Sequence, residues 1–267
     1  MTAPPDRLSP ATSPTPPDRG SRRRRGIARY LTAVVFTLIV AVPAVPDLLF
    51  GLDRRSPFTQ LVSFRPWILC GVAALLVLLL VVMVFERRVL PFVAGVLAVL
   101  LLGGAVVLPR IVPDPVPTGG TALRVLAFNT YEGDADAEEL AALIERERPD
   151  VAAIIESGDE FAEQLEPLVE PLGYRLHLPS ESKEDVDGIT AVVSDRFGDV
   201  DVRIGDETSR FSYVQVSGGE LGPLRFVAFH SVAPVPGSVP DWNADLALLP
   251  EWCTGPTPAV VAGDFNA

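Results

Sequence analysis

The sequence predicts two parts: helices that span a membrane, followed by an α/β domain built on a mixed sheet. Charge divides the chain, because residues 1–118 hold 13 of the 22 basic residues but only 6 of the 34 acidic ones. Long uncharged apolar runs precede residue 110, whereas short β-branched runs alternate with amphipathic segments after it. These patterns are typical of membrane helices and of an α/β domain, respectively.

The first part begins with a basic tail, residues 1–29, which is rich in Pro, Ser and Thr at first and is predicted to be disordered. A membrane domain of three helices is expected over residues 30–108. Each span has the roughly 20 apolar residues that a bilayer crossing needs. Two further spans follow the first, which favours a retained helix over a cleaved signal peptide. The predicted spans are about 30–50, 66–85 and 89–108.

Arginines set the expected topology of these spans. A run at residues 22–25 precedes the first span, and Arg87 and Arg88 lie between the second and third. The positive-inside rule places both segments in the cytoplasm, against a weaker opposing signal from arginines in the first loop. We therefore predict a multi-pass protein of the cell membrane with a cytoplasmic N-terminus. A stiff Pro-rich linker at residues 109–120 would lead to an extracytoplasmic domain at 121–267.

The domain reads as alternating strands and helices. Helices are expected at residues 136–148, 159–172 and 241–252. Several strands follow one another with only Gly and Asp turns between them, which favours hairpins and a mixed sheet. Strands are expected at residues 123–128, 151–155, 189–194, 200–204, 211–216, 224–229 and 258–262.

Polar side chains stand where several of these strands end, on the rim where open α/β sheets bind ligands. They are Asn129, Glu156, His230, Asp264 and Asn266. Each alone has an ordinary interpretation as a turn residue, a helix cap or a structural histidine. Together they suit a hard cation and a phosphate, because Mg²⁺ prefers carboxylates, substrate oxygens and water. The histidine could donate to a phosphate oxygen, and Asp264 could hold a metal or orient water.

Composition excludes other chemistry. The two cysteines, Cys70 and Cys253, fall in different parts of the chain, which argues against a disulfide framework and a cysteine metal site. The acidic second part argues against avid, sequence-blind binding of nucleic acid, which relies on Lys and Arg. It does not exclude hydrolysis of a phosphodiester, since a bound divalent cation supplies positive charge locally.

About residues 119–267 resemble the endonuclease/exonuclease/phosphatase superfamily, which includes DNase I-like nucleases. The resemblance identifies the chain as a membrane-anchored bacterial member and implies a four-layer α/β sandwich of two mixed sheets. The Gly-Asp-Phe-Asn element is its most specific motif. The matching segments, in the family's order, are residues 127–130, 154–156, 187–194, 229–231 and 263–266.

The resemblance also implies roles for the polar residues. Glu156 would bind Mg²⁺ or Mn²⁺ with Asn129 beside it, and Asp264 would position the attacking water and contribute to the metal site. His230 would hydrogen-bond the scissile phosphate, and Asn266 would orient it. Two departures stand out. The family usually has Gln where Ile155 stands, and its later Asp and closing Asp-His pair do not occur before residue 267. We therefore expect a chain cut short within its catalytic domain and inactive as a fragment.

The predicted function is a membrane-tethered, metal-dependent phosphoesterase that hydrolyses a phosphodiester or a phosphomonoester with activated water. Extracellular nucleic acid, a phospholipid head group and a small phosphodiester remain alternative substrates, with the lipid bilayer as the second partner. No protein partner can be inferred. Two rivals belong to other classes: an inactive family member that acts as an extracytoplasmic binding or scaffolding module, and a domain that only stabilises a membrane complex.

Overall fold

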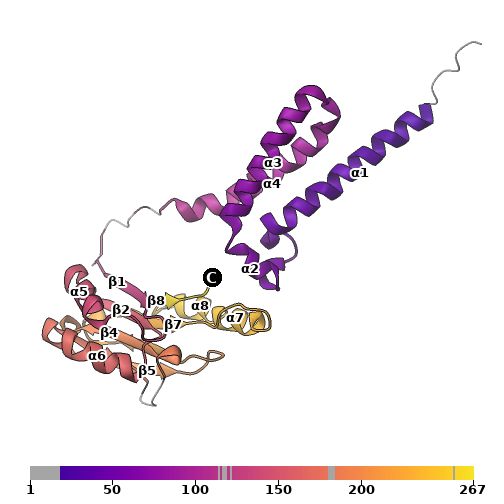
Figure 1. Cartoon of the computed structure of the whole chain (residues 1–267). Helices are drawn as coiled ribbons and strands as arrows, with labels where there is room; N and C mark the ends of the chain where they lie inside the picture. The colour runs from indigo at the N-terminus through magenta and orange to yellow at the C-terminus, as the bar shows by residue number, and fades with distance from the viewer. Residues whose placement is uncertain (1–18, 114, 116–118, 121, 180–183, 255) are drawn as a thin grey trace, which may run out of the picture. The chain divides into compact units, whose positions relative to one another are not determined.

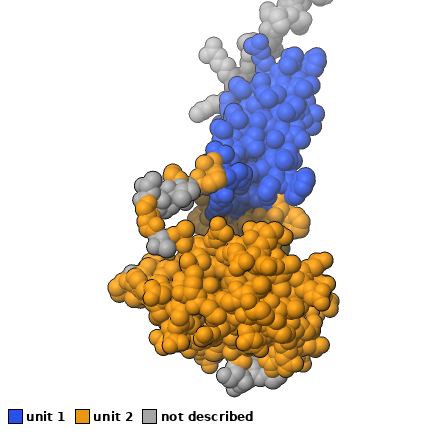
Figure 2. Space-filling model, turned by 90° about the vertical axis from the view of Figure 1, so that its left-hand side faces the viewer, with its two compact units in different colours: residues 1–45, 65–111 blue, residues 46–64, 112–267 orange. Residues whose placement is uncertain are grey.

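A computed structural model describes residues 19–113, 115, 119–120, 122–179, 184–254 and 256–267. Residues 1–18 of the predicted tail and part of the predicted linker lie outside these residues. Residues 19–29, which were expected to be disordered, belong to helix α1 (Arg19–Ala44). The chain divides into two compact units, which Figure 2 colours separately. Unit 1 comprises residues 1–45 and 65–111, and unit 2 comprises residues 46–64 and 112–267.

Unit 1 contains three long helices, α1 (Arg19–Ala44), α3 (Arg65–Phe85) and α4 (Leu90–Ile111), and the 3₁₀ turn η3 (Arg87–Val89). All three are long and apolar enough to cross a membrane, with mean hydropathies of 1.9, 3.3 and 2.5 in their candidate spans. The first helix ends at Ala44, six residues before the predicted end of its span. Pro46, which has no backbone N–H to continue the helix, accounts for this early end.

Unit 2 opens with the segment that joins α1 to α3. This segment, residues 46–64, forms the short elements η1 (Pro46–Leu48), η2 (Leu52–Arg54) and α2 (Phe58–Val62). The rest of the unit carries two four-stranded sheets (Figure 1). The first has the order β1-β2-β4-β3 and the second the order β5-β6-β7-β8. The strands are β1 (Val125–Asn129), β2 (Val151–Ile155), β3 (Tyr174–His177), β4 (Ile189–Ser194), β5 (Asp201–Gly205), β6 (Tyr213–Ser217), β7 (Arg225–His230) and β8 (Ala259–Asp264).

Both sheets are mixed, which confirms that prediction. β1 and β2 are parallel, as are β7 and β8, and the remaining neighbours are antiparallel. Helix α5 (Ala137–Glu147) begins after Asp136, whose carboxylate accepts from the backbone amides of Glu138 and Glu139. Such a cap satisfies amides that the first turn leaves without partners.

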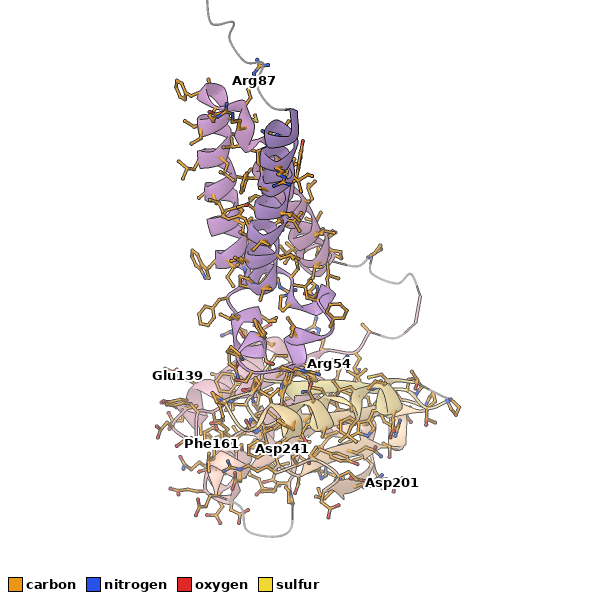
Figure 3. The ribbon with its side chains drawn as sticks, turned by 90° about the vertical axis from the view of Figure 1, so that its right-hand side faces the viewer. Arg54, Arg87, Glu139, Phe161, Asp201 and Asp241 are labelled. Atoms are coloured by element: carbon orange, nitrogen blue, oxygen red, sulfur yellow. The ribbon has the colours of Figure 1, made fainter. Side chains whose placement is uncertain are left out.

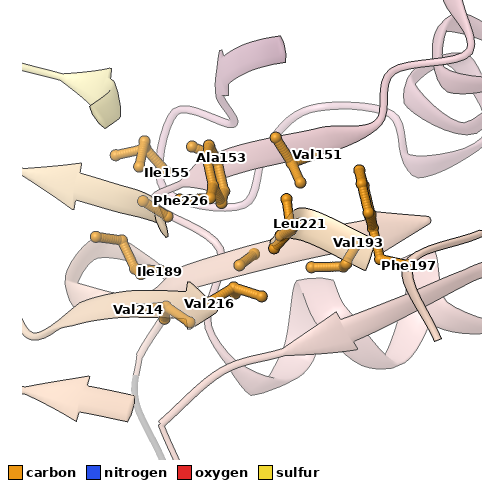
Figure 4. Packing of buried hydrophobic residues seen from close by; sticks show 12 residues of the cluster. Val151, Ala153, Ile155, Ile189, Val193, Phe197, Val214, Val216, Leu221 and Phe226 are labelled. Atoms are coloured by element: carbon orange, nitrogen blue, oxygen red, sulfur yellow. The ribbon is translucent and has the colours of Figure 1, made fainter. Parts of the chain in front are cut away.

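Unit 2 has four layers: helices α5 and α6 (Asp159–Val169), the first sheet, the second sheet, and the C-terminal helices. Three apolar clusters lie between them. The central one, shown in Figure 4, lies between the two sheets and includes Val151, Ile155, Val214 and Phe226. A second buries α5 and α6 against the first sheet. A third packs Trp252 against the other face of the second sheet. Every residue of β2 is buried, and each large one contributes about 1.5–3 kcal/mol by leaving water.

Two expectations about unit 2 were wrong in detail. The helix expected at residues 241–252 is two helices, α7 (Val239–Leu246) and α8 (Leu249–Cys253), and Pro250 occupies the first turn of the second. Proline suits a first turn, where its missing N–H has no partner to lose. Strand β3 was not expected at all. Its four residues form an edge strand that pairs, among the described residues, only with β4. The strand is too short for a clear alternating pattern.

His177, at the end of β3, makes the unit's stability depend on pH. Burial, and then the nearby Arg175, lower the pKa of His177 below its ordinary value of 6.5. The unfolded chain therefore takes up this proton more readily, and the free energy of unfolding falls as the pH drops below about 6.5. We expect the His177→Gln variant to lose less stability than wild type between pH 7.5 and 5.5. Chemical unfolding followed by tryptophan fluorescence measures this, and equal losses in both proteins would contradict it.

Candidate active site

The strand ends that carry the predicted residues meet at one edge of unit 2. β1 packs against β8 and β2 against β7 across the two sheets. Within the sheets, Asn129 stands opposite Ile155, and His230 stands opposite Asp264. The parallel pairs therefore bring their carboxyl ends together, as the sequence predicted for the ligand rim.

Asn129 joins two carboxylates at this edge. Its Nδ2 donates to Glu156 Oε1 at 2.9 Å and to Asp264 Oδ2 at 3.1 Å. Its Oδ1 accepts from the backbone amide of Tyr131 at 2.7 Å, and Glu156 Oε2 accepts from the amide of Glu132 at 2.7 Å. One amide thus holds two carboxylates from different sheets close together.

Four non-glycine residues around this cluster adopt left-handed backbone conformations, with φ of 54° at Tyr131, 58° at Glu132, 57° at Glu156 and 48° at Asn266. This region costs an L-residue roughly 1–2 kcal/mol. The hydroxyl of Thr130 donates to the carbonyl of Glu156, which ties the two left-handed segments together. Such conformations cluster at functional sites, where the surrounding structure enforces them.

His230 is 4% exposed and stacks on Phe211, with ring centroids 4.0 Å apart and planes 7° apart. Burial lowers the pKa of His230, although the negative charges of Asp264 and Glu156 oppose that change. Its Nδ1 is buried and has no hydrogen-bond partner among the described residues. A neutral imidazole of this kind offers one N–H donor and one acceptor.

Asn266 is fixed by its own turn and by the neighbouring strand. Its backbone amide donates to Asp264 Oδ1 at 2.9 Å, and its Nδ2 donates to the carbonyl of Ser231 at 2.8 Å. The hydroxyl of Ser231 in turn donates to the carbonyl of Phe265 at 2.6 Å. These hydrogen bonds therefore connect the loop after His230 directly to the Gly-Asp-Phe-Asn turn.

Sequence reasoning missed a cation near this edge. Nε of Arg210 donates to Asp187 Oδ1 at 3.0 Å, and Nη2 of the same side chain lies 2.8 Å from that oxygen. The charge of Arg210 lowers the pKa of His230, and the charge of Asp187 raises it. Asp187 begins one of the segments that carry the family resemblance, residues 187–194, but no local signal marks its partner Arg210, which is 23 residues later in the sequence.

The residues at this edge fit a hard divalent cation. Glu156 and Asp264 supply carboxylate oxygens, and Mg²⁺ is commonly held by one or two carboxylates, with water and substrate oxygens completing the shell. Within the described part of the chain, no group of three or more His, Cys, Asp or Glu side chains could hold a metal ion. A metal here would therefore depend on substrate oxygens for much of its coordination.

Asp245, on α7, ties together the two loops that flank the histidine. It is 1% exposed, and its carboxylate accepts from the amide of Ser209 at 2.7 Å and from the amide of Val232 at 3.0 Å. We expect Asp245→Ala to lower the free energy of unfolding by about 2–5 kcal/mol, because two buried amides lose their acceptor. Asp245→Asn, which keeps one acceptor oxygen, should lose less. Chemical unfolding measures both, and equal losses would contradict this account.

The comparison with known families agrees with this geometry. The Endonuclease/Exonuclease/phosphatase family matches residues 126–267, more than half of the chain, and the chain belongs to this family. No curated protein matches the sequence.

Several solved structures are similar to part of the chain at low identity. A crystal structure of ANGEL2, described as a 2′,3′-cyclic phosphatase, is 16% identical with a TM-score of 0.43, and the match covers 54% of each chain. A humanized D. rerio TDP2 is 17% identical with a TM-score of 0.42, over 54% of this chain and 63% of that one. An endonuclease/exonuclease/phosphatase from Beutenbergia cavernae is 20% identical with a TM-score of 0.42, over 54% and 47%. The chain thus spans about half to two thirds of these relatives.

Proposed function

We propose that the protein is a membrane-tethered, divalent-metal-dependent phosphoesterase that hydrolyses a phosphodiester, or a phosphomonoester, with activated water. The observation that carries this proposal is the joining of Glu156 and Asp264 by Asn129, at the edge where His230 is buried beside them. Membership of a family named for nucleases and phosphatases supports it.

Each residue has a role in this reaction. Glu156 and Asp264, joined by the side-chain amide of Asn129, would hold Mg²⁺ or Mn²⁺, which when bound offsets the charge of the phosphate. Asp264 orients the attacking water, and His230 and Asn266 donate hydrogen bonds to the phosphate oxygens. The water oxygen gives up a proton and forms a bond to phosphorus, the bond from phosphorus to the leaving oxygen breaks, and the leaving oxygen takes up a proton.

We further propose that three membrane spans place this site outside the cytoplasm. The support is the length and hydropathy of α1, α3 and α4 together with the arginines at residues 22–25, Arg87 and Arg88. Reporter fusions after Leu108 test this arrangement. An alkaline phosphatase fusion should be active there, and activity only of a cytoplasmic reporter would reverse the topology.

The experiment that tests the activity uses the full-length protein and bis-p-nitrophenyl phosphate, with Mg²⁺, with Mn²⁺ or with EDTA. Metal-dependent turnover is expected, and it should stop when the metal is chelated. A folded protein that turns over neither this diester nor p-nitrophenyl phosphate with either metal would favour the alternative, a family member that binds but does not hydrolyse.

A further inference from the structure

The segment of residues 46–64, called the interhelical segment below, is far from the site in sequence but belongs to the same compact unit as the site. It joins two helices that are candidate membrane spans. Its sequence does not indicate that it belongs with the α/β domain, although it packs within unit 2.

Two side-chain hydrogen bonds connect the interhelical segment to the loop and helix that follow His230. Gln60 Nε2 donates to the carbonyl of Pro234 at 2.5 Å, and Asn243 Nδ2, on α7, donates to the carbonyl of Arg54 at 3.2 Å. The 3₁₀ turn η2, which contains Arg54, packs against α7 (Figure 3). Both contacts span more than 170 residues of sequence.

The contacted loop is continuous with the site. Pro234 lies in a turn that has two backbone hydrogen bonds. The amide of Val235 donates to the carbonyl of Ala233 at 2.8 Å, and the amide of Ser238 donates to the carbonyl of Val235 at 3.1 Å. Three residues before Pro234, the carbonyl of Ser231 accepts the hydrogen bond that fixes the Asn266 side chain. A contact on Pro234 therefore bears on the loop that orients Asn266.

We infer that the interhelical segment is a positioning element of the active site, which holds the loop of residues 231–238 and α7 through Gln60 and Asn243. The inference rests on the proposed function for its effect on hydrolysis, but not for its effect on the loop. Because the segment joins α1 to α3, the order of a site loop depends on a connection within the membrane domain. Catalysis would then require both parts of the chain.

The test compares the full-length protein with Gln60→Glu and Asn243→Asp, each of which removes an N–H donor at nearly constant shape. Gln164→Glu is the matched control, because Gln164 is exposed on α6 and makes the same change of charge. Hydrogen exchange of the peptide covering residues 232–238 should be about two- to tenfold faster in Gln60→Glu, the effect of losing one hydrogen bond. It should be at least as fast in Asn243→Asp, which also loses the hydrogen bond from Nδ2 to the carbonyl of Val239 at 2.9 Å. Exchange in β4 should not change, and KM for the diester should rise more than kcat falls.

Two outcomes would overturn the inference. One is unchanged exchange at residues 232–238 in both variants. The other is an equal acceleration in the loop and in β4, which would mean general destabilisation instead of release of this loop. Failure of the proposed function gives a different result, since turnover would be absent in wild type while the exchange difference remained measurable.

Discussion

Replacing Asp264 by Asn, or Glu156 by Gln, in the full-length protein is expected to lower kcat/KM for a phosphodiester by about 10²–10⁴-fold. Each substitution keeps the size of the side chain and removes a negative charge that would face the metal and the attacking water. Because Asn129 hydrogen-bonds to both carboxylates, the losses should not add in the double variant. Steady-state rates at saturating Mg²⁺ measure this.

Glu132 provides the matched control. It lies beside Glu156 and is exposed, but it meets that carboxylate through its backbone amide, which Glu132→Gln leaves in place. This variant should stay within about a factor of two of wild type. Equal activity in Glu156→Gln and Glu132→Gln would remove Glu156 from the reaction and with it the proposed metal site.

Strand-end chemistry was the part of the site that sequence could predict. Asn129, Glu156, His230 and Asp264 each follow an apolar run, and the carboxyl ends of parallel strands meet by geometry alone. No such rule locates Arg210. Arg210 precedes β6 of the second sheet, whereas its partner Asp187 precedes β4 of the first sheet. The two residues therefore meet only when the two sheets pack together.

Tertiary contacts also explain what was missed in the fold. The sequence predicted residues 46–50 as the end of the first span and the rest of the interhelical segment as a loop. Contacts across more than 170 residues of sequence assign the segment to unit 2. β3 is held as an edge strand by β4, not by a strong pattern of its own. The prediction of a mixed sheet, in contrast, followed from runs such as residues 151–155 and 189–194, whose side chains are almost all buried. That there are two such sheets was implied by the family resemblance.

Gly263→Ala is expected to lower the free energy of unfolding by about 2–5 kcal/mol. Gly263 has φ of +144° within β8, and a Cβ there would lie 1.9 Å from the carbonyl oxygen of Phe229. Relief of that clash would move β8 away from β7, and Asp264 with it, so hydrolysis should fall as well.

Gly173→Ala separates the two causes. Gly173 has φ of +85° and ψ of 42°, in the left-handed region, but a Cβ there would meet no atom within 4 Å, so the substitution carries only the backbone penalty of roughly 1–2 kcal/mol. Chemical unfolding of the two variants side by side measures the difference. Equal losses in both variants would mean that the backbone conformation alone explains the glycine at position 263, and that its close approach to β7 does not matter.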